Sequence, residues 1–221
     1  MVTFTYRLGR SLSRFVGLCC IRYIILHRER AEIPGGYILA CTHLSHVEPC
    51  LVTAVVDRQI EWMARIEFYK FRLIGWLLKA MSAFPVDRFG VPVSSIRAAI
   101  GRARAGRLVG IFPEGGVAHG KDSIVGGGSF KKGMCVIAYR AGVPVLPVVV
   151  LGTRALTRVK PWLPFKHARV QMIFGQLVHP PLHEPRRRVA REIMARDLQA
   201  EFIAIHKELC AACGFNEADL G

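Results

Sequence analysis

Acidic residues are scarce in this chain of 221 residues, which holds 16 Asp and Glu against 31 Lys and Arg. The formal net charge of +15 predicts an anionic partner, such as nucleic acid, an acidic ligand or a membrane surface. Aromatic residues make up only 9% of the chain, and most are Phe within apolar runs. Single-stranded nucleic-acid binders interleave aromatic and basic residues, so we expect no nucleic acid as partner. A membrane surface is favoured because hydrophobic residues reach 52%.

The sequence also lacks a long apolar run and a paired set of cysteines. The longest apolar stretch near the N-terminus, 15–21, is shorter than the roughly 20 residues that a spanning helix needs. A charged segment at 27–30 stands where a secretory signal would have small residues. The seven scattered cysteines predict buried thiols in a reducing compartment. Cys210 and Cys213 are compatible with redox chemistry or half a zinc site, but no second pair or nearby His completes four ligands.

Short apolar runs alternate with segments of helical periodicity along most of the chain. We predict strands at 37–41, 60–64, 84–86, 108–112, 143–151 and 170–174, and helices at 46–57, 71–82, 94–105, 132–141 and 185–213. Such alternation is typical of an α/β fold in which helices flank a mostly parallel central sheet.

The first residues form a different kind of segment. Helical spacing over 3–26 places basic residues on one face and apolar residues on another: Arg7, Arg10 and Arg14, and Leu8, Leu12, Phe15 and Leu18. The pattern predicts either an interfacial helix with its cations toward anionic lipid, or a packed helix with a solvated basic face. We therefore divide the chain into an N-terminal amphipathic membrane-interface helix, 1–30, and an α/β domain, 31–221.

A histidine and a carboxylate follow the first predicted strand of the α/β domain. Residues 42–48 read Thr-His-Leu-Ser-His-Val-Glu, and ligands of parallel sheets bind beyond the carboxyl ends of the strands. A carboxylate at Glu48 can hold the His43 imidazole in one tautomer, as a general base requires. Two other interpretations stay open, namely a capping box formed by Ser45 and Glu48, and a metal site that also includes His46.

Two further segments end at the same predicted edge of the sheet. Phe-Pro-Glu-Gly-Gly at 112–116 supplies a carboxylate and flexible backbone amides, and Val-Asp-Arg at 86–88 supplies a guanidinium suited to phosphate. Each segment alone is compatible with an ordinary turn or a surface ion pair. Together with His43 they predict one site.

Four blocks of the chain then match a known pattern in order. Residues 42–48 are given above; 64–68 read Ala-Arg-Ile-Glu-Phe and are followed by Gly75 and the Val-Asp-Arg block. Residues 112–115 read Phe-Pro-Glu-Gly, and 130–133 and 141–148 read Phe-Lys-Lys-Gly and Ala-Gly-Val-Pro-Val-Leu-Pro-Val. In these blocks, over roughly 35–155, the sequence resembles the glycerolipid acyltransferases of the lysophosphatidate acyltransferase (PlsC-type) group.

The resemblance implies an O-acyltransferase of membrane lipid biosynthesis. His43 would deprotonate the acceptor hydroxyl, which attacks the thioester of acyl-CoA or acyl carrier protein directly, and Glu48 would orient His43. The implied substrate-binding residues are Arg65, Arg88, Glu114, Gly115 and Lys131. No metal and no organic cofactor is implied, since the thioester already carries an activated acyl group. The implied partners are an anionic membrane surface, a lysolipid acceptor and the acyl donor, for a peripheral or monotopic protein at the cytoplasmic face.

Two departures from the family pattern concern the substrate. Glu48 replaces an Asp, and Gly116 and Val117 replace a Thr-Arg pair whose Arg is often assigned to the glycerol phosphate. The acceptor is therefore lysophosphatidate, another lysolipid or another hydroxylated lipid. Two alternatives to an acyltransferase remain, a non-catalytic basic lipid-binding protein with a further basic run at 186–188, and a metal-dependent hydrolase.

Overall fold

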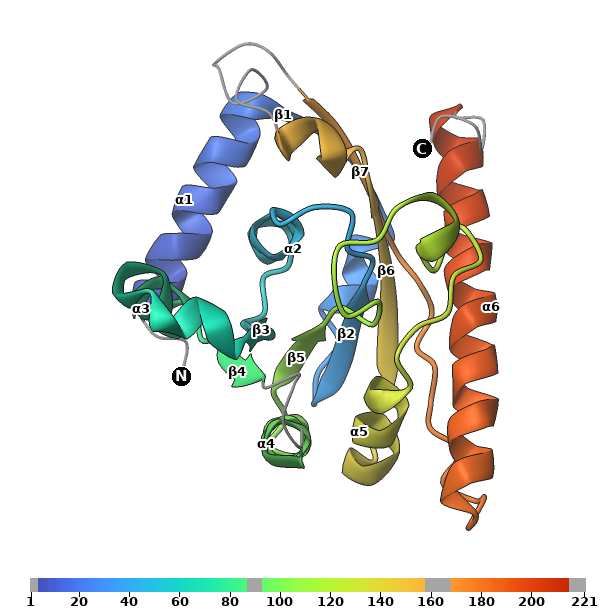
Figure 1. The fold of residues 1–221 in the computed structure, drawn as a ribbon. Coiled ribbons are helices and arrows are strands. Elements are labelled where there is room, and N and C mark those ends of the chain that lie inside the picture. Colours follow the sequence, from blue (N-terminus) through green and yellow to red (C-terminus); the bar gives the residue numbers. More distant parts are fainter. Residues whose placement is uncertain (1–3, 87–92, 158–167, 215–221) are drawn as a thin grey trace.

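The computed structural model describes residues 4–86, 93–157 and 168–214 (Figure 1). The strands are β1 (Ile21–Leu26), β2 (Tyr37–Cys41), β3 (Ile60–Arg65), β4 (Phe84–Val86), β5 (Leu108–Ile111), β6 (Val145–Leu151) and β7 (Ala168–Phe174). The α-helices are α1 (Phe4–Cys20), α2 (Glu48–Val55), α3 (Arg72–Ala80), α4 (Val93–Arg104), α5 (Gly133–Ala141) and α6 (Arg187–Cys213). The elements predicted after residue 30 exist, and their ends lie within two residues of the predicted limits.

The described strands form one seven-stranded sheet in the order β1-β7-β6-β2-β5-β3-β4. Neighbouring strands run parallel, except that β6 and β7 pair antiparallel. This confirms the prediction of an α/β fold with a mostly parallel central sheet. The central strand β2 is buried along its whole length, as expected when helices cover both faces.

Side chains of β2 alternate between two hydrophobic clusters, one on each face of the sheet. Ile38 and Ala40 pack with residues of α4, α5 and α6, whereas Tyr37, Leu39 and Cys41 pack with residues of α2. In Figure 1, α4, α5 and α6 accordingly lie on one side of the sheet, and α1 and α2 lie on the other. The two layers hold the strand ends in fixed positions, which a site built from loops requires.

The N-terminal segment differs from the prediction, because the helix over 3–26 is wrong beyond residue 20. Helix α1 ends at Cys20, and 21–26 form strand β1, which pairs with β7 at the edge of the sheet. The sequence of this strand, Ile-Arg-Tyr-Ile-Ile-Leu, is rich in β-branched and aromatic residues that favour strands. The predicted domain limit at residue 30 is untested, but the sheet includes residues that precede it.

Helix α1 is amphipathic, and of its predicted basic residues Arg7 is exposed, whereas Arg10 and Arg14 are partly buried. Arg10 and Arg14 lie 3.9 Å and 3.3 Å from a carboxylate oxygen of Asp57, just beyond α2. The large apolar side chains that α1 exposes are Phe4, Leu8, Leu12, Phe15 and Leu18. Helix α3, which contacts α1, exposes a similar set made up of Leu73, Ile74, Trp76 and Leu77.

Two further observations concern the membrane and the thiols. No helix within the described ranges is both long and apolar enough to cross a bilayer. The prediction of buried thiols is correct for Cys20, Cys41, Cys135 and Cys210, whereas Cys19 and Cys50 are exposed and Cys213 is partly exposed.

Candidate functional site

The carboxyl ends of three adjacent parallel strands, β5, β2 and β6, meet at one edge of the sheet. Each strand is followed by a polar residue: His43 follows β2, Glu114 follows β5 and Thr153 follows β6. Side chains at such an edge share one space, so residues far apart in the sequence come together.

His43 contacts a buried carboxylate on the first residue of α2. The His43 Nδ1 lies 3.0 Å from Oε2 of Glu48, whose side chain is fully buried, while the His43 side chain is 12% exposed. A carboxylate only accepts, so Nδ1 carries the hydrogen and donates it, leaving Nε2 with its lone pair. The second carboxylate oxygen of Glu48 accepts a hydrogen bond from the Thr153 hydroxyl. The arrangement holds one imidazole tautomer beside partly open space.

The capping-box interpretation of Ser45 and Glu48 is wrong. Both carboxylate oxygens of Glu48 bond to His43 and Thr153, and the N-cap residue Val47 has no side-chain cap. The Ser45 hydroxyl instead accepts a hydrogen bond from the Val47 N–H. A buried carboxylate requires hydrogen-bond donors, and Glu48 finds them on the imidazole and the threonine.

Two aromatic rings fix the plane of the imidazole. The Phe112 ring stacks on His43 at a centroid distance of 4.1 Å, and Trp62 stacks on Phe112 at 4.9 Å. Trp62 is itself held by a 3.0 Å bond from its Nε1 to the Thr53 hydroxyl in α2. The stack therefore runs from β3 through the end of β5 to His43 and restricts rotation of the imidazole.

Glu114 joins two loops beside His43. Its Oε2 accepts the backbone N–H of His43 at 2.6 Å, and its Oε1 accepts the N–H of Ile124 at 3.0 Å. Burial raises the pKa of the Glu114 carboxyl above its usual value of 4.5, and these two N–H bonds oppose the rise. Glu114 thus positions the backbone of His43, and its substrate-binding role stays a prediction.

Three of the predicted substrate-binding residues line a cavity of about 240 Å³ next to Phe112. They are Arg65, Gly115 and Lys131, and the walls between them are mostly apolar, with Ile111 and Met134 among the lining residues. Gly115 has φ +78°, and a Cβ there would lie 2.7 Å from Cε of Lys131. The glycine therefore lets the lysine side chain cross the turn after β5.

Other predicted positions are distributed as follows. Arg88 and Asp87 lie outside the described residues, although Val86, just before them, lines the same cavity. The loop that carries Val117 is next to the histidine, because the Ala118 N–H donates to the His43 carbonyl at 2.9 Å. Glu67 pairs with Arg65 at 3.4 Å.

Within the described ranges, no group of three or more His, Cys, Asp or Glu side chains is placed to hold a metal ion. The His46 ring lies 5.9 Å from the His43 ring, edge to face, and is exposed. Burial raises the pKa of the Cys41 thiol well above its usual range, and the nearby Glu48 and Glu114 carboxylates raise it further. Cys41 is therefore a neutral thiol and a poor nucleophile.

Sequence reasoning missed Thr153 and Phe112. Thr153 stands two residues after β6, a position from which a polar side chain reaches the sheet edge, but the sequence does not reveal that β6 neighbours β2. The sequence places Phe112 at the end of a predicted strand and at the start of the Phe-Pro-Glu-Gly block, without a role in the site. An aromatic residue that directly follows a strand of this edge is a usable signal for a ring packed against the site.

Comparisons with known proteins agree with this geometry. A family model described as Acyltransferase matches residues 24–151, which include His43, Glu48, Glu114 and Lys131. A 1-acyl-sn-glycerol-3-phosphate acyltransferase of Bacillus subtilis (strain 168) is 30% identical over 156 residues, covering 70% of this chain and 73% of the relative. The enzyme of the same name from Streptococcus pneumoniae (strain ATCC BAA-255 / R6) is 28% identical over 175 residues, covering 78% and 61%.

A solved structure shares the fold. The crystal structure of the 1-acyl-sn-glycerophosphate (LPA) acyltransferase, PlsC, from Thermotoga maritima superposes with a TM-score of 0.62. The match covers 88% of this chain and 79% of that chain at 22% sequence identity. The likeness supports the α/β architecture.

Proposed function

Because the chain belongs to the acyltransferase family and is an enzyme of the 1-acylglycerol-3-phosphate acyltransferase type, we propose that it acylates a lysophospholipid. The acyl group would move from a thioester, acyl-CoA or acyl carrier protein, to a hydroxyl of lysophosphatidate or a related lysolipid. The observation that carries the proposal is the 3.0 Å contact between His43 and the buried Glu48.

The proton path follows from the tautomer of His43. With its hydrogen on Nδ1, the imidazole takes the proton of the acceptor hydroxyl on Nε2, and the resulting imidazolium is stabilised by Glu48. The hydroxyl oxygen attacks the thioester carbonyl, the C–S bond breaks, and His43 returns the proton to the leaving thiolate. No acyl-enzyme is needed, and the neutral Cys41 thiol is poorly suited to form one. The thioester is already activated, so we propose no metal and no organic cofactor.

The cavity beside Phe112 suits a molecule with an anionic head and an apolar tail. Arg65 and Lys131 supply positive charge, and residues such as Met63, Ile96 and Ile137 supply apolar contacts. A guanidinium or an ammonium binds phosphate through charge-assisted hydrogen bonds. We propose that this cavity receives the acceptor with its head group toward Arg65 and Lys131.

The exposed apolar faces of α1 and α3 support attachment to a bilayer surface. Leu8 is 61% exposed and Leu12 62% on α1, while Leu73 is 77% exposed and Trp76 64% on α3. Large contiguous apolar surfaces of this kind are unusual in freely soluble monomers and mark interaction sites. The two helices contact each other, and an interfacial helix buries its apolar face at the boundary of headgroups and acyl chains. We propose a peripheral or monotopic enzyme on the cytoplasmic side of an anionic membrane.

The test is product analysis with the purified protein. Acyl-CoA and acyl carrier protein donors are each incubated with a panel of lysolipids, and the products are identified by mass spectrometry. We expect a diacyl lipid to form, and His43→Ala to reduce its rate by about 10²–10⁴, the usual contribution of a general base. Free fatty acid as the only product, with sensitivity to chelators, would instead indicate a hydrolase. Undiminished turnover by folded His43→Ala would contradict the proposed mechanism.

A further inference from the structure

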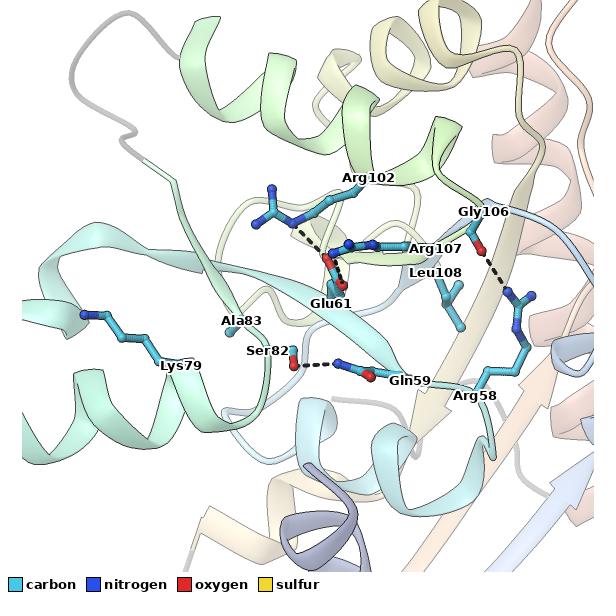
Figure 2. A pocket seen from close by; sticks show the side chains of 10 residues that line it. All are labelled: Arg58, Gln59, Glu61, Lys79, Ser82, Ala83, Arg102, Gly106, Arg107 and Leu108. Carbon is cyan, nitrogen blue, oxygen red and sulfur yellow. Dashed lines mark hydrogen bonds and ion pairs between the residues drawn. The ribbon is translucent and has the colours of Figure 1, made fainter. Parts of the chain in front are cut away.

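A second cavity, of about 680 Å³, opens at the opposite edge of the sheet from His43 (Figure 2). Its lining includes Arg58, which precedes β3, and Arg107, which precedes β5, whereas the candidate active site lies beyond the carboxyl ends of the strands. The cavity therefore lies at the amino ends of the strands, and the length of the strands separates it from the candidate active site at their carboxyl ends. The volume falls within the range of pockets that hold small molecules.

The charge of this cavity is strongly positive. Four cationic side chains line it, from Arg58, Lys79, Arg102 and Arg107, and one carboxylate, from Glu61. At neutral pH the lining groups thus carry 4 − 1 = 3 positive charges in excess. An excess of one sign in a concave site attracts ligands of the opposite sign.

The carboxylate holds two of the guanidinium groups in place. The Glu61 side chain is 9% exposed, and its oxygens lie 2.8 Å from Nε of Arg102 and 3.0 Å from an Nη of Arg107. Figure 2 shows both arginines converging on Glu61. The Arg107 side chain is 57% exposed, so part of its donor fork faces the open cavity. Because Glu61 already holds the Arg107 guanidinium, its remaining N–H donors can bind a ligand with little further loss of side-chain entropy.

Arg58 is fixed by the backbone instead. One of its terminal nitrogens donates to the carbonyls of Gly35 and Gly106 at 2.6 Å and 3.2 Å, and the guanidinium carbon lies 5.2 Å from the centroid of the Tyr37 ring. Carbonyl partners do not cancel the positive charge of Arg58. The cavity therefore has a prearranged cationic wall, and Lys79 of α3, which lies apart from the arginines in Figure 2, also lines it.

We propose that this cavity binds a phosphate-bearing ligand. Guanidinium groups match the geometry of phosphate oxygens, and a compact ammonium such as that of Lys79 adds a further positive charge to the lining. The phosphate comes either from the head group of an anionic phospholipid or from a soluble phosphate compound. A head group is compatible with the position of the cavity, because Lys79 belongs to the helix that exposes Trp76 and Leu77. The proposal does not depend on acyl transfer.

The test measures two kinds of binding at low salt. Pyrophosphate is titrated into the full-length protein by calorimetry, and vesicles of phosphatidylcholine, with or without phosphatidylglycerol, are used in co-sedimentation. The variants are Lys79→Gln and Arg107→Gln, and the control is Arg104→Gln, an exposed cation of α4 that bonds to the Arg140 carbonyl outside the cavity. Lys79 has an exposed side chain, so its variant tests the cavity without disturbing Glu61.

We expect each cavity variant to weaken binding by about tenfold, as for the loss of one charged hydrogen bond, and Arg104→Gln to stay within about twofold. Weaker pyrophosphate binding identifies a soluble phosphate ligand. Weaker binding only to vesicles with phosphatidylglycerol identifies a lipid head group. If neither measurement distinguishes the cavity variants from wild type, or if Arg104→Gln weakens binding equally, the proposal is overturned.

Discussion

Glu48 contacts His43, the proposed general base, through one carboxylate oxygen and the Thr153 hydroxyl through the other, so we propose Thr153 as a positioning residue. Thr153→Val keeps the shape of the side chain but removes the donor. A hydrogen bond to a charged group is worth roughly 1.5–3 kcal/mol, so we expect kcat to fall by about 10- to 100-fold with little change in KM. Initial rates of thiol release, measured at saturating donor and acceptor, check this.

Thr153→Ser serves as the matched control, because it restores a hydroxyl at the same position. We expect it to recover most of the lost kcat, which a merely structural role of the threonine methyl group would not allow. Equal losses in the valine and serine variants would show that the hydroxyl does not act through Glu48.

The buried carboxyl of Glu114 predicts a pH-dependent contribution to stability. Its raised pKa means that, just above pH 4.5, the folded protein retains the Glu114 proton after the unfolded chain has lost it. The stability contributed by this group therefore falls as pH rises through that window. Compared with Glu114→Gln, wild type should lose part of its advantage in unfolding free energy as the pH rises above about 4.5.

Urea unfolding, followed by tryptophan fluorescence at several pH values, measures that difference. The glutamine variant loses one acceptor for the N–H groups of His43 and Ile124, so we expect it to be less stable by about 1–3 kcal/mol at low pH. If the difference in unfolding free energy between wild type and Glu114→Gln stays constant or grows as the pH rises, burial does not raise the pKa of the Glu114 carboxyl.

The sequence predicted the residues of the site that share one segment. His43 and Glu48 are five positions apart, and the length of the loop alone brings them into contact. Thr153 is distant in sequence from Glu48, and their contact depends on β6 lying beside β2. Local spacing reports contacts within one loop, whereas contacts between loops require the strand order.

At the scale of single elements, α3 shows how a helix can be predicted without its role. The spacing over 71–82 predicted a helix, but not that its apolar residues stay exposed. We expect Leu73→Ser to reduce co-sedimentation with vesicles containing phosphatidylglycerol, since each leucine side chain buried in the bilayer contributes about 1.5–3 kcal/mol.

The control for that experiment is Leu182→Ser, which makes the same change at another exposed leucine, 59% exposed, shortly before α6. In Figure 1, α6 lies across the molecule from α1 and α3. We expect this variant to bind vesicles as wild type does. Equal loss in both variants would mean that α3 is not the membrane-facing element.

The prediction of a helix over 3–26 included strand β1 because a short apolar run is compatible with both the helical and the strand period. After Cys20, the residues Ile21, Tyr23 and Ile25 recur at every second position, which is a strand period, but six residues are too few to outweigh the helical pattern before them. The strand forms because β7 offers it a partner. Pairing with β7, which is distant in the sequence, therefore determines that residues 21–26 form a strand.

For the whole molecule, the sequence predicted most of the helices and strands but not the order of the strands in the sheet. The order β1-β7-β6-β2-β5-β3-β4 places the first strand beside the last, and no periodicity along the chain reports such a pairing. The acyltransferase assignment, by contrast, was predicted from the motif blocks and is confirmed by the family match. The motif blocks were recognisable because the residues of each block are neighbours in the sequence.

The pairing of β1 with β7 predicts that the N-terminal segment is part of the folded unit. Deleting 1–20 removes α1, including the buried Tyr6, whose hydroxyl accepts the Ile60 N–H, but leaves the sheet complete. Deleting 1–26 also removes the β1 ladder and Ile21, which is 4% exposed. A few ladder bonds at about 1 kcal/mol each, plus about 2 kcal/mol for the isoleucine, approach the 5–15 kcal/mol that stabilises a typical domain.

We therefore expect the shorter deletion to unfold cooperatively at a reduced Tm, and the longer one to melt at least about 10 °C lower still or to lack a cooperative transition. Circular dichroism melts in a mild detergent compare the two, because the detergent removes differences in solubility. Release from membranes after deletion of 1–26 would then reflect unfolding, which is why point substitutions such as Leu73→Ser test the membrane surface more cleanly. Equal Tm values for the two deletions would show that β1 adds nothing to the stability of the sheet.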